Sequence, residues 1–125
     1  MKCLVVDDSA TMRRIVVNAL KTLGYQQVVE AGDGKEALAV CDASIEMVIT
    51  DWNMPNMGGL ELVKSLRANP QTAKTPILMV TTRSVKEDIL QAVEAGVNSY
   101  ILKPFTPQVL KEKLDQITSP ASGAA

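Results

Sequence analysis

Five short apolar runs, separated by longer amphipathic stretches, constrain the fold of this chain more than any other feature of its sequence. Each run is mostly β-branched or aliphatic and is bounded by polar or turn residues. Such runs predict strands that are buried on both faces, as the strands of a parallel sheet are. The second run is the weakest of the five. The runs occupy residues 3–6, 28–29, 47–50, 76–81 and 99–102.

The stretches between these runs have the periodicity of amphipathic helices. In the first stretch, Ile15, Ala19 and Leu23 recur at steps of four residues on one helical face. Start and stop signals flank the stretches: stops at Gly24, Asn69-Pro70 and Gly96, capping boxes at Asp33 with Glu36 and at Ser84 with Glu87, and a start at Thr106-Pro107. The alternation predicts an α/β domain with a parallel sheet and helices on both of its faces.

The length of the chain predicts one domain. Its 125 residues leave no room for a second domain of ordinary size. Hydrophobic residues make up 46% and charged residues 22%, proportions that are typical of a folded protein. We expect the domain to span residues 1–118, followed by a flexible tail of small and polar residues at 119–125.

Charge and residue counts exclude several classes of function. The net charge of −1 lacks the positive excess that a broad nucleic-acid or anionic-membrane surface needs. No apolar run approaches the roughly 18 residues of a membrane span, and the sequence does not start with a secretory signal. The absence of histidine excludes Ser-His-Asp catalysis and His-ligated metals within this chain. Cys3 and Cys41 lack CxxC spacing, so we expect two reduced, buried thiols in a cytoplasmic protein.

Acidic and polar residues stand where the predicted strands end. Because the carboxyl ends of parallel strands form the binding edge of such a sheet, we expect these side chains to meet there. Three carboxylates at one edge repel each other unless a cation lies among them, and oxygen ligands without His or Cys favour Mg²⁺. The residues are Asp7 and Asp8 after the first run, Asp51 after the third, Thr81 at the end of the fourth and Lys103 after the fifth.

Each of these residues also has an ordinary structural interpretation. The aspartates could cap helices or make loops soluble, and Asp8 could cap the first helix with or without a metal. Lys103 could be a surface lysine, although a charge directly after an apolar strand favours pairing with the carboxylates. A threonine in a strand is unremarkable, so spacing alone leaves the role of Thr81 open.

Taken together, these motifs resemble a response-regulator receiver domain, in order and in spacing, from residue 1 to about residue 118. Within that family the chain is most similar to the stand-alone chemotaxis regulators. The resemblance implies a flavodoxin-like, doubly wound sheet of five parallel strands in the order 2-1-3-4-5, with five helices. The motifs are Asp7-Asp8, Asp51-Trp-Asn-Met-Pro-Asn-Met-Gly-Gly, Val80-Thr81 and Tyr100-Ile-Leu-Lys-Pro-Phe.

The resemblance also implies a metal-dependent phosphoacceptor site. Asp51 is the implied phosphoacceptor and, with Asp8, a direct ligand of Mg²⁺. Asp7 is implied to hold the ion mostly through water, and Asn53 to bind it through its main-chain carbonyl. Phosphoryl transfer to a carboxylate needs mainly positioning and charge neutralisation, which such a set of residues supplies.

The remaining motif residues are implied to form a switch. Lys103 pairs with the acceptor and then with the phosphoryl oxygens, and Thr81 moves to donate a hydrogen bond to the phosphoryl group. Tyr100 then turns into the space that Thr81 leaves. The Lys103-Pro104 peptide bond is implied to be cis.

Three positions depart from the usual family pattern. Ser9 follows the acidic pair where a phenylalanine is common, which we expect to be a minor packing change. Gly58 stands where many members carry an acidic or amide residue, which predicts a looser loop after Asp51. Arg83 is cationic where the best-known chemotaxis members are acidic. We hypothesise that Arg83 reaches towards the phosphoryl group and alters the lifetime of the phosphate.

By resemblance, the phosphodonor is a histidine kinase and the output is binding to another protein, with a flagellar motor switch protein as the leading candidate. We expect a monomeric phosphoacceptor switch, not an enzyme in the ordinary sense, with no nucleic-acid partner. The output face is expected on the fourth helix, fifth strand and fifth helix. Its candidate residues are Lys86, Val93, Tyr100 and Lys113, although Lys86 and Lys113 could equally belong to solvated helix faces.

Other functions remain open on the sequence. A small Mg²⁺-dependent phosphatase with an aspartyl nucleophile is the chief alternative, although such enzymes carry D-x-D where this chain has Asp7-Asp8. A flavin mononucleotide binder is disfavoured because a phosphate-binding loop would not open with two aspartates. A receiver from another signalling pathway, or a scaffold that never takes phosphate, would share the fold.

Overall fold

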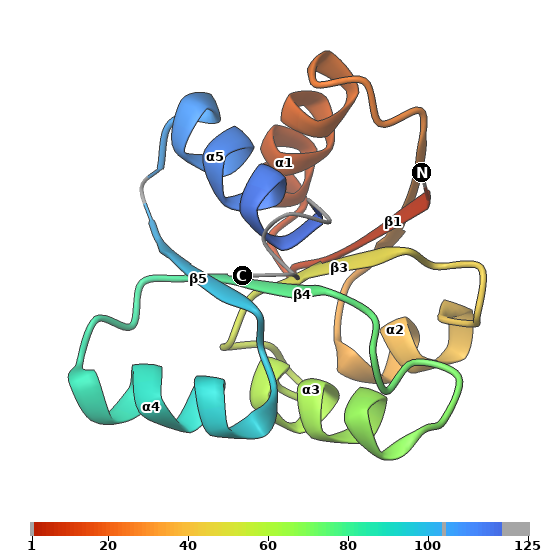
Figure 1. The fold of residues 1–125 in the computed structure, drawn as a ribbon, viewed down its shortest axis with the longest axis vertical. Coiled ribbons are helices and arrows are strands. Elements are labelled where there is room, and N and C mark those ends of the chain that lie inside the picture. The colour runs from red at the N-terminus through yellow and green to blue at the C-terminus, as the bar shows by residue number, and fades with distance from the viewer. Residues whose placement is uncertain (1, 104, 119–125) are drawn as a thin grey trace.

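In the computed structural model, which describes residues 2–103 and 105–118, strands and helices alternate along the chain (Figure 1). The predicted runs all form strands, and the amphipathic stretches all form helices. The strands are β1 (Lys2–Val6), β2 (Gln27–Ala31), β3 (Met47–Thr50), β4 (Ile77–Thr81) and β5 (Ser99–Leu102). The helices are α1 (Ala10–Thr22), α2 (Gly34–Val40), α3 (Gly59–Ala68), α4 (Lys86–Ala95) and α5 (Pro107–Thr118).

The strands form one parallel sheet in the order β2-β1-β3-β4-β5, which confirms the expected topology. Helices α1 and α5 cover one face, and α2, α3 and α4 cover the other (Figure 1). The strand order reverses between β1 and β3, so the carboxyl ends of these two strands lie side by side. Binding sites of open α/β sheets form at such a reversal.

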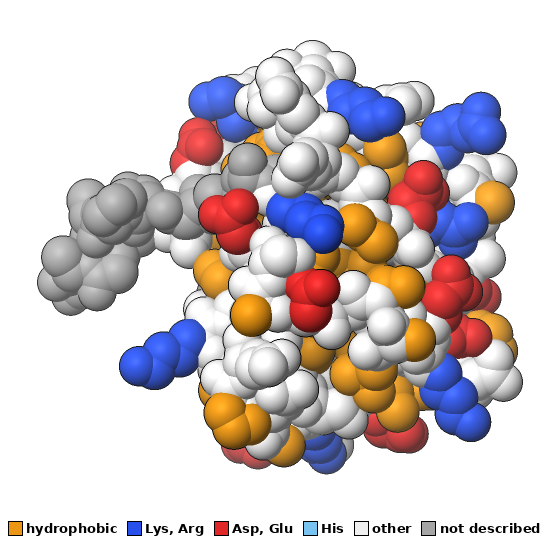
Figure 2. Space-filling view, turned by 90° about the vertical axis from the view of Figure 1, so that its right-hand side faces the viewer, with side chains coloured by type: hydrophobic (Ala, Val, Ile, Leu, Met, Phe, Trp, Pro, Cys, Tyr) orange, Lys and Arg blue, Asp and Glu red, His pale blue; other side chains and the backbone are white. Residues whose placement is uncertain are grey.

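Apolar side chains fill both faces of the sheet. The central strands β3 and β4 are buried along their whole length, as their continuous apolar runs predict. Strand β2 lies at an edge and is largely exposed or half-buried, which explains why its run in the sequence is short. On the other faces of the helices, acidic and basic side chains are interspersed, as Figure 2 shows for the side of the molecule that carries α2 and β2.

Most of the predicted helix ends are confirmed. Asp33 caps α2 by accepting a hydrogen bond from the backbone N–H of Glu36 at 2.8 Å. Thr106 accepts one from the N–H of Val109 at 3.2 Å in front of α5. Gly96 ends α4 in the left-handed conformation, with φ of 118°. Gly24, with φ of 101°, follows the end of α1.

One predicted cap is wrong. The residue before α4 is Val85, so Ser84 and Glu87 form no capping box. In the segment before α4, Arg83 contacts Asp88 in the first turn of α4. It also contacts Asn53 and Tyr100, which are distant in the sequence and which no local pattern reveals. At α1 the cap is Ser9, whose hydroxyl accepts from the N–H of Met12 at 3.2 Å, so Asp8 is left available for the site.

Details of burial also differ from the periodicity. Helix α1 packs through Val16, Val17 and Leu20, while Ile15 is 48% exposed. Both cysteines are free, as expected, but only Cys3 is fully buried. Burial raises the pKa of the Cys3 thiol to about 11, so it stays protonated at neutral pH.

Two expectations lie outside the described residues: the cis Lys103-Pro104 bond and the tail at 119–125. Among the helices of the described ranges, none is both long and apolar enough to cross a bilayer.

Candidate functional site

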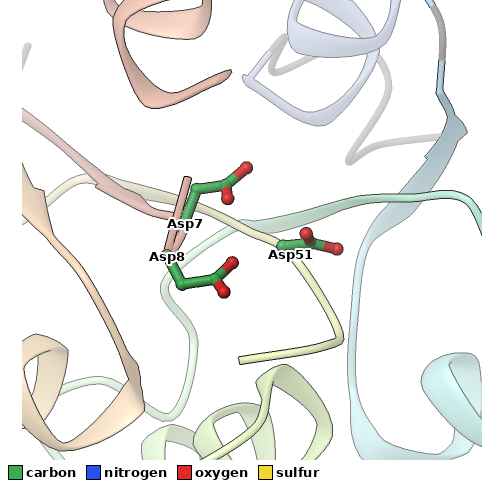
Figure 3. Close-up of side chains that lie close together, drawn as sticks. All are labelled: Asp7, Asp8 and Asp51. Atoms are coloured by element: carbon green, nitrogen blue, oxygen red, sulfur yellow. The ribbon is translucent and has the colours of Figure 1, made fainter. Parts of the chain in front are cut away.

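The register of β1 and β3 brings three carboxylates together. Val6 pairs with Thr50, so the residues that follow them, Asp7 and Asp51, emerge level with one another. The N–H of Asp51 donates to the carbonyl of Val6 at 3.0 Å and continues this pairing past the strand end. The carboxylates of Asp7, Asp8 and Asp51 reach into the same space (Figure 3), and each offers an oxygen within 4.8 Å of the others.

Lys103 lies between two of these carboxylates. Its Nζ donates to Oδ2 of Asp7 at 3.1 Å and to Oδ2 of Asp51 at 3.0 Å, and all three side chains are at most 13% exposed. Its own N–H donates to the carbonyl of Thr81 at 2.8 Å, which anchors the end of β5 to β4. Burial alone would lower the pKa of Lys103, but Asp51 and Asp7 outweigh it and the pKa is raised. The lysine is therefore a charged counter-ion in the site.

The donor set fits a hard divalent cation. Magnesium binds oxygen ligands at about 2.1 Å, so two ligands on opposite sides of one ion lie about 4.2 Å apart. A cluster within 4.8 Å needs only a small shift, or one carboxylate bound through water, to meet this geometry. Asp8 is exposed, whereas Asp7 is held by the N–H of Ser9 at 2.9 Å and by Lys103. Asp51 is likewise held by the N–H of Trp52 and by Lys103, so of the three carboxylates the exposed Asp8 is best placed for direct ligation.

The predicted switch residues lie at the same edge of the sheet. Thr81 is fully buried, and its hydroxyl accepts a hydrogen bond from the N–H of Arg83 at 3.3 Å. Tyr100 is half-buried and donates its hydroxyl to the carbonyl of Arg83 at 2.7 Å. Burial, together with the negative charge of Asp88, raises the pKa of Tyr100 and keeps this donor protonated. The side chains of Thr81 and Tyr100 therefore both form hydrogen bonds with the main chain of Arg83, in the loop after β4.

Arg83 crosses from β4 towards the loop after Asp51. Its guanidinium lies 4.6 Å from the centre of the Trp52 ring and donates to Oδ1 of Asn53 at 2.8 Å. It also forms a salt bridge of 3.3 Å with Asp88 in the first turn of α4. The side chain thus contacts the neighbours of the acceptor, and its direct reach to a phosphoryl group remains a hypothesis.

A cavity of about 510 Å³ opens beside Asp8. Gly58 contributes no side chain to it and is the N-cap of α3 without a side-chain hydrogen bond, and the predicted looseness of this loop stays a prediction. A small phosphodonor has room there. The lining residues are Asp8, Trp52, Asn53, Met54, Gly58 and Glu61.

The candidate output residues lie on and beside the β5 edge of the sheet. Lys86 and Val93 are exposed on α4, and Lys113 is half-buried on α5, on the opposite side of β5 (Figure 1). Exposed apolar side chains accompany them, as a protein-binding surface requires. They are Val85, Leu90, Leu102 and Val109.

The positioning roles of two residues, Ser9 and Arg13, were not predicted from the sequence. Ser9 both caps α1 and donates its N–H to Asp7. Arg13 donates to the main-chain carbonyl of Asp7 at 2.6 Å and forms a 3.0 Å salt bridge with Glu30. An N-cap serine after an acidic pair is a signal that could have been used, whereas the contact of Arg13 with β2 has none.

Comparisons with known proteins identify the family of this chain. The family model described as the response regulator receiver domain matches residues 3–115. The chain belongs to this family. The receiver domain is 54% identical to a chemotaxis protein CheY homolog of Campylobacter jejuni, over 98% of this chain and 96% of the relative. It is 56% identical to the chemotaxis protein CheY1 of Helicobacter pylori, over 94% of this chain and 96% of the relative.

Solved structures agree with the fold of this receiver domain. The structure of the chemotaxis protein CheY4 of Vibrio cholerae superposes with a TM-score of 0.85 at 39% sequence identity. The superposition covers 93% of this chain and 97% of that one.

Proposed function

We propose that this receiver domain is a phosphorylation-dependent switch of a chemotaxis pathway. It takes a phosphoryl group from a histidine kinase onto Asp51, with Mg²⁺ bound among Asp7, Asp8, Asp51 and the main-chain carbonyl of Asn53. The observation that carries the proposal is the position of Lys103, whose ammonium contacts Asp7 and Asp51 at 3.1 and 3.0 Å beside the exposed Asp8. A cation in this place neutralises the acceptor and stays close to an incoming phosphate.

In the proposed transfer, a carboxylate oxygen of Asp51 forms a bond to phosphorus. The bond from phosphorus to the kinase imidazole nitrogen breaks, and its electron pair leaves with that nitrogen. Bound Mg²⁺ would supply neutralisation of the phosphoryl charge. Lys103 contributes its ammonium to the phosphoryl oxygens, and the N–H of Trp52, which donates to Oδ1 of Asp51 at 2.6 Å, holds the carboxylate in place.

The switch follows from the new charge. An added phosphoryl group brings roughly −1.5 to −2 of charge and strong acceptor oxygens, on the scale known for phosphoserine. The Thr81 hydroxyl, which accepts from the N–H of Arg83, would turn to donate to these oxygens. Since the Tyr100 hydroxyl donates a hydrogen bond to the carbonyl of Arg83, a shift of this loop changes the protein surface around Tyr100.

The proposed output is the binding of another protein at the α4-β5-α5 face. The relatives named as chemotaxis proteins favour a flagellar motor switch protein as the target. The exposed apolar residues of that face, Val85, Leu90, Val93, Leu102 and Val109, support a protein partner.

Intact-mass analysis after incubation with Mg²⁺ and acetyl phosphate tests the proposal. We expect one phosphoryl adduct on the wild type, none on Asp51→Asn, and none when Mg²⁺ is chelated. Asp42→Asn is a matched control, because Asp42 is an exposed aspartate that bonds to Ser44, and it should be phosphorylated normally. Repeated turnover of small phosphate esters would favour the phosphatase alternative instead.

A further inference from the structure

The loop at residues 52–58, between β3 and α3, is anchored at its base. The N–H of Gly59 donates to the carbonyl of Trp52 at 2.8 Å. A Cβ at Gly59 would lie 1.9 Å from the carbonyl oxygen of Asp51, so this close approach requires glycine. The loop therefore leaves and rejoins the fold beside the acceptor.

The tip of the same loop is held by α2. The side-chain amide of Asn56 donates to Oδ2 of Asp33 at 2.7 Å, and the N–H of Gly34 donates to the carbonyl of Met57 at 3.0 Å. A Cβ at Gly34 would lie 2.6 to 2.8 Å from atoms of Met57, so the backbones meet directly. We call these four residues, Asp33, Gly34, Asn56 and Met57, the loop clasp.

The backbone of Asn56 shows that the clasp holds a specific shape. Its φ of 65° is in the left-handed region, where asparagine is tolerated better than most residues but still costs free energy. Such a conformation persists where surrounding contacts determine it. Here the contacts are the side-chain hydrogen bond to Asp33 and the main-chain bond from the N–H of Met57 to the carbonyl of Pro55, which spans Asn56 at 2.6 Å.

Asp33 has two separate tasks in the clasp. Oδ1 accepts from the N–H of Glu36 and caps α2, and Oδ2 accepts from Asn56. These hydrogen bonds, first that of Glu36 and then that of Asn56, lower the pKa of Asp33, so both oxygens are acceptors at neutral pH. One carboxylate thus links the start of α2 to the loop beside the acceptor.

The clasped loop carries the groups that the metal site needs. Trp52, Asn53, Met54 and Gly58 line the cavity beside Asp8. We propose that the loop clasp positions the 52–58 loop for metal binding, with Asp33 and Asn56 as positioning residues. This inference rests on the proposed function, because the expected ligand from the loop is the main-chain carbonyl of Asn53.

The coupling is reciprocal by thermodynamic linkage. If the clasp favours the metal-binding form of the loop, metal binding favours the clasp and stabilises the start of α2. Helix α2 lies at the β2 end of the molecule, away from β5 (Figure 1; the side is shown in Figure 2). The metal site is therefore coupled to a second surface, distinct from the α4-β5-α5 face.

Four variants distinguish the effect of losing the clasp from the effect of destabilising the fold. Asn56→Gly removes the side-chain hydrogen bond and relieves the left-handed backbone. Asp33→Ser keeps a good N-cap for α2, but one hydroxyl cannot also serve Asn56. Asp33→Asn is the conservative rescue, because its second polar atom can pair with a flipped Asn56 amide. The Asn56→Gly, Asp33→Ser double variant tests whether both changes remove the same contact.

Mg²⁺ titration, followed by fluorescence of Trp52, the single tryptophan, measures the effect. We expect the Kd for Mg²⁺ to rise about tenfold in Asn56→Gly and in Asp33→Ser, as for other outer contacts of metal sites. The double variant should bind Mg²⁺ no more weakly than either single variant, and the Kd of Asp33→Asn should be close to that of the wild type. Hydrogen exchange should show that Mg²⁺ protects the amides of Gly34–Val40 in the wild type and not in Asp33→Ser.

The possible failures are distinguishable. Unchanged Mg²⁺ affinity in folded Asn56→Gly and Asp33→Ser, beside a wild type that binds Mg²⁺, would overturn the clasp and leave the proposed function intact. A wild type that binds no Mg²⁺ would overturn both. Urea unfolding of each variant shows that the Kd is measured on folded protein.

Discussion

Lys103 illustrates how much depends on whether a charge is buried. Its ammonium forms salt bridges with Asp7 and Asp51, whose side chains are 6% and 13% exposed. Lys111 forms a comparable pair with Asp115 at 3.2 Å on the surface of α5, but those side chains are 59% and 63% exposed. The two pairs have the same chemistry and differ in solvent screening.

Replacing these lysines should therefore have unequal effects. Lys103→Met leaves two facing carboxylates without a cation and should lower the free energy of unfolding by about 3 kcal/mol. Lys111→Met should change it by less than about 0.5 kcal/mol. Urea denaturation without Mg²⁺ measures both, and equal losses would contradict the assigned burial.

The pKa of Lys103 gives a pH prediction. A lysine whose pKa is raised by folding contributes stability that is complete below its unfolded value of about 10.5. That contribution is lost as the pH rises through the higher folded value. The difference in free energy of unfolding between wild type and Lys103→Met should thus be constant from pH 7 to about 10 and shrink above it. A difference that shrinks already near pH 8 would show that the pKa is lowered.

Arg83 is the residue through which we expect this chain to set its phosphate lifetime. It lies over Trp52 and donates to Asn53, so it covers the loop next to the acceptor. In Arg83→Ala water gains access there, and dephosphorylation of Asp51 should be at least about threefold faster, which is roughly 0.7 kcal/mol in the barrier. Phosphate decay measures this, with Arg14→Ala, an exposed arginine on α1, as the control. Equal decay rates would dismiss the hypothesis.

Among the elements, α3 and α4 are joined by Arg67 at the end of the sheet away from the acceptor. Its guanidinium donates to the carbonyl of Gly96, just past α4, and to Oδ1 of Asn98 before β5. It also donates hydrogen bonds to three main-chain carbonyls between α3 and β4, those of Thr72, Ala73 and Thr75. One side chain thus fixes the far end of the helix that carries much of the proposed output face.

A pair of glycines tests this junction. Gly24 and Gly96 both have left-handed backbones, but a Cβ at Gly24 meets nothing within 4 Å, whereas one at Gly96 lies 2.8 Å from Arg67. Gly24→Ala should cost about 1 kcal/mol for backbone strain alone. Gly96→Ala should cost at least about 2 kcal/mol, because it also displaces Arg67. Thermal unfolding compares the two, and equal costs would mean that Arg67 moves aside freely.

At the scale of the whole molecule, the acidic cluster that is proposed to bind Mg²⁺ also lowers the stability of the metal-free fold. Three carboxylates with one lysine leave excess negative charge at the edge of the sheet. A ligand that binds only the folded state stabilises it, so Mg²⁺ should stabilise the chain by an amount that rises with the logarithm of its concentration above the Kd.

Removal of one carboxylate should separate these effects. Asp8→Asn should be more stable than the wild type in chelator, because one like charge is gone. Mg²⁺ at ten times its Kd should add about 1.4 kcal/mol to the wild type and much less to Asp8→Asn. Urea midpoints with and without Mg²⁺ check this, and the same gain in both proteins would argue against Asp8 as a ligand.

The arrangement of strands and helices was readable from the sequence because it depends on short-range patterns. Apolar runs, glycine stops and caps such as Asp33 and Thr106 act within a few residues, and the structure confirms them. Asp7, Asp8, Asp51 and Lys103 could be predicted to meet because every parallel strand ends at the same edge. Ser84 is not the cap that the local signal predicts: the N-cap of α4 is Val85, in a segment where Arg83 contacts the distant Asn53.

The partners of individual side chains were decided only by the tertiary structure. Arg83 lies on Trp52, Arg13 reaches Asp7 and Glu30, and Asn56 reaches Asp33, across separations that no periodicity encodes. Local patterns constrain where a side chain starts on the backbone. Its partner depends on how separate β-α units pack, since packing alone determines which surfaces face each other.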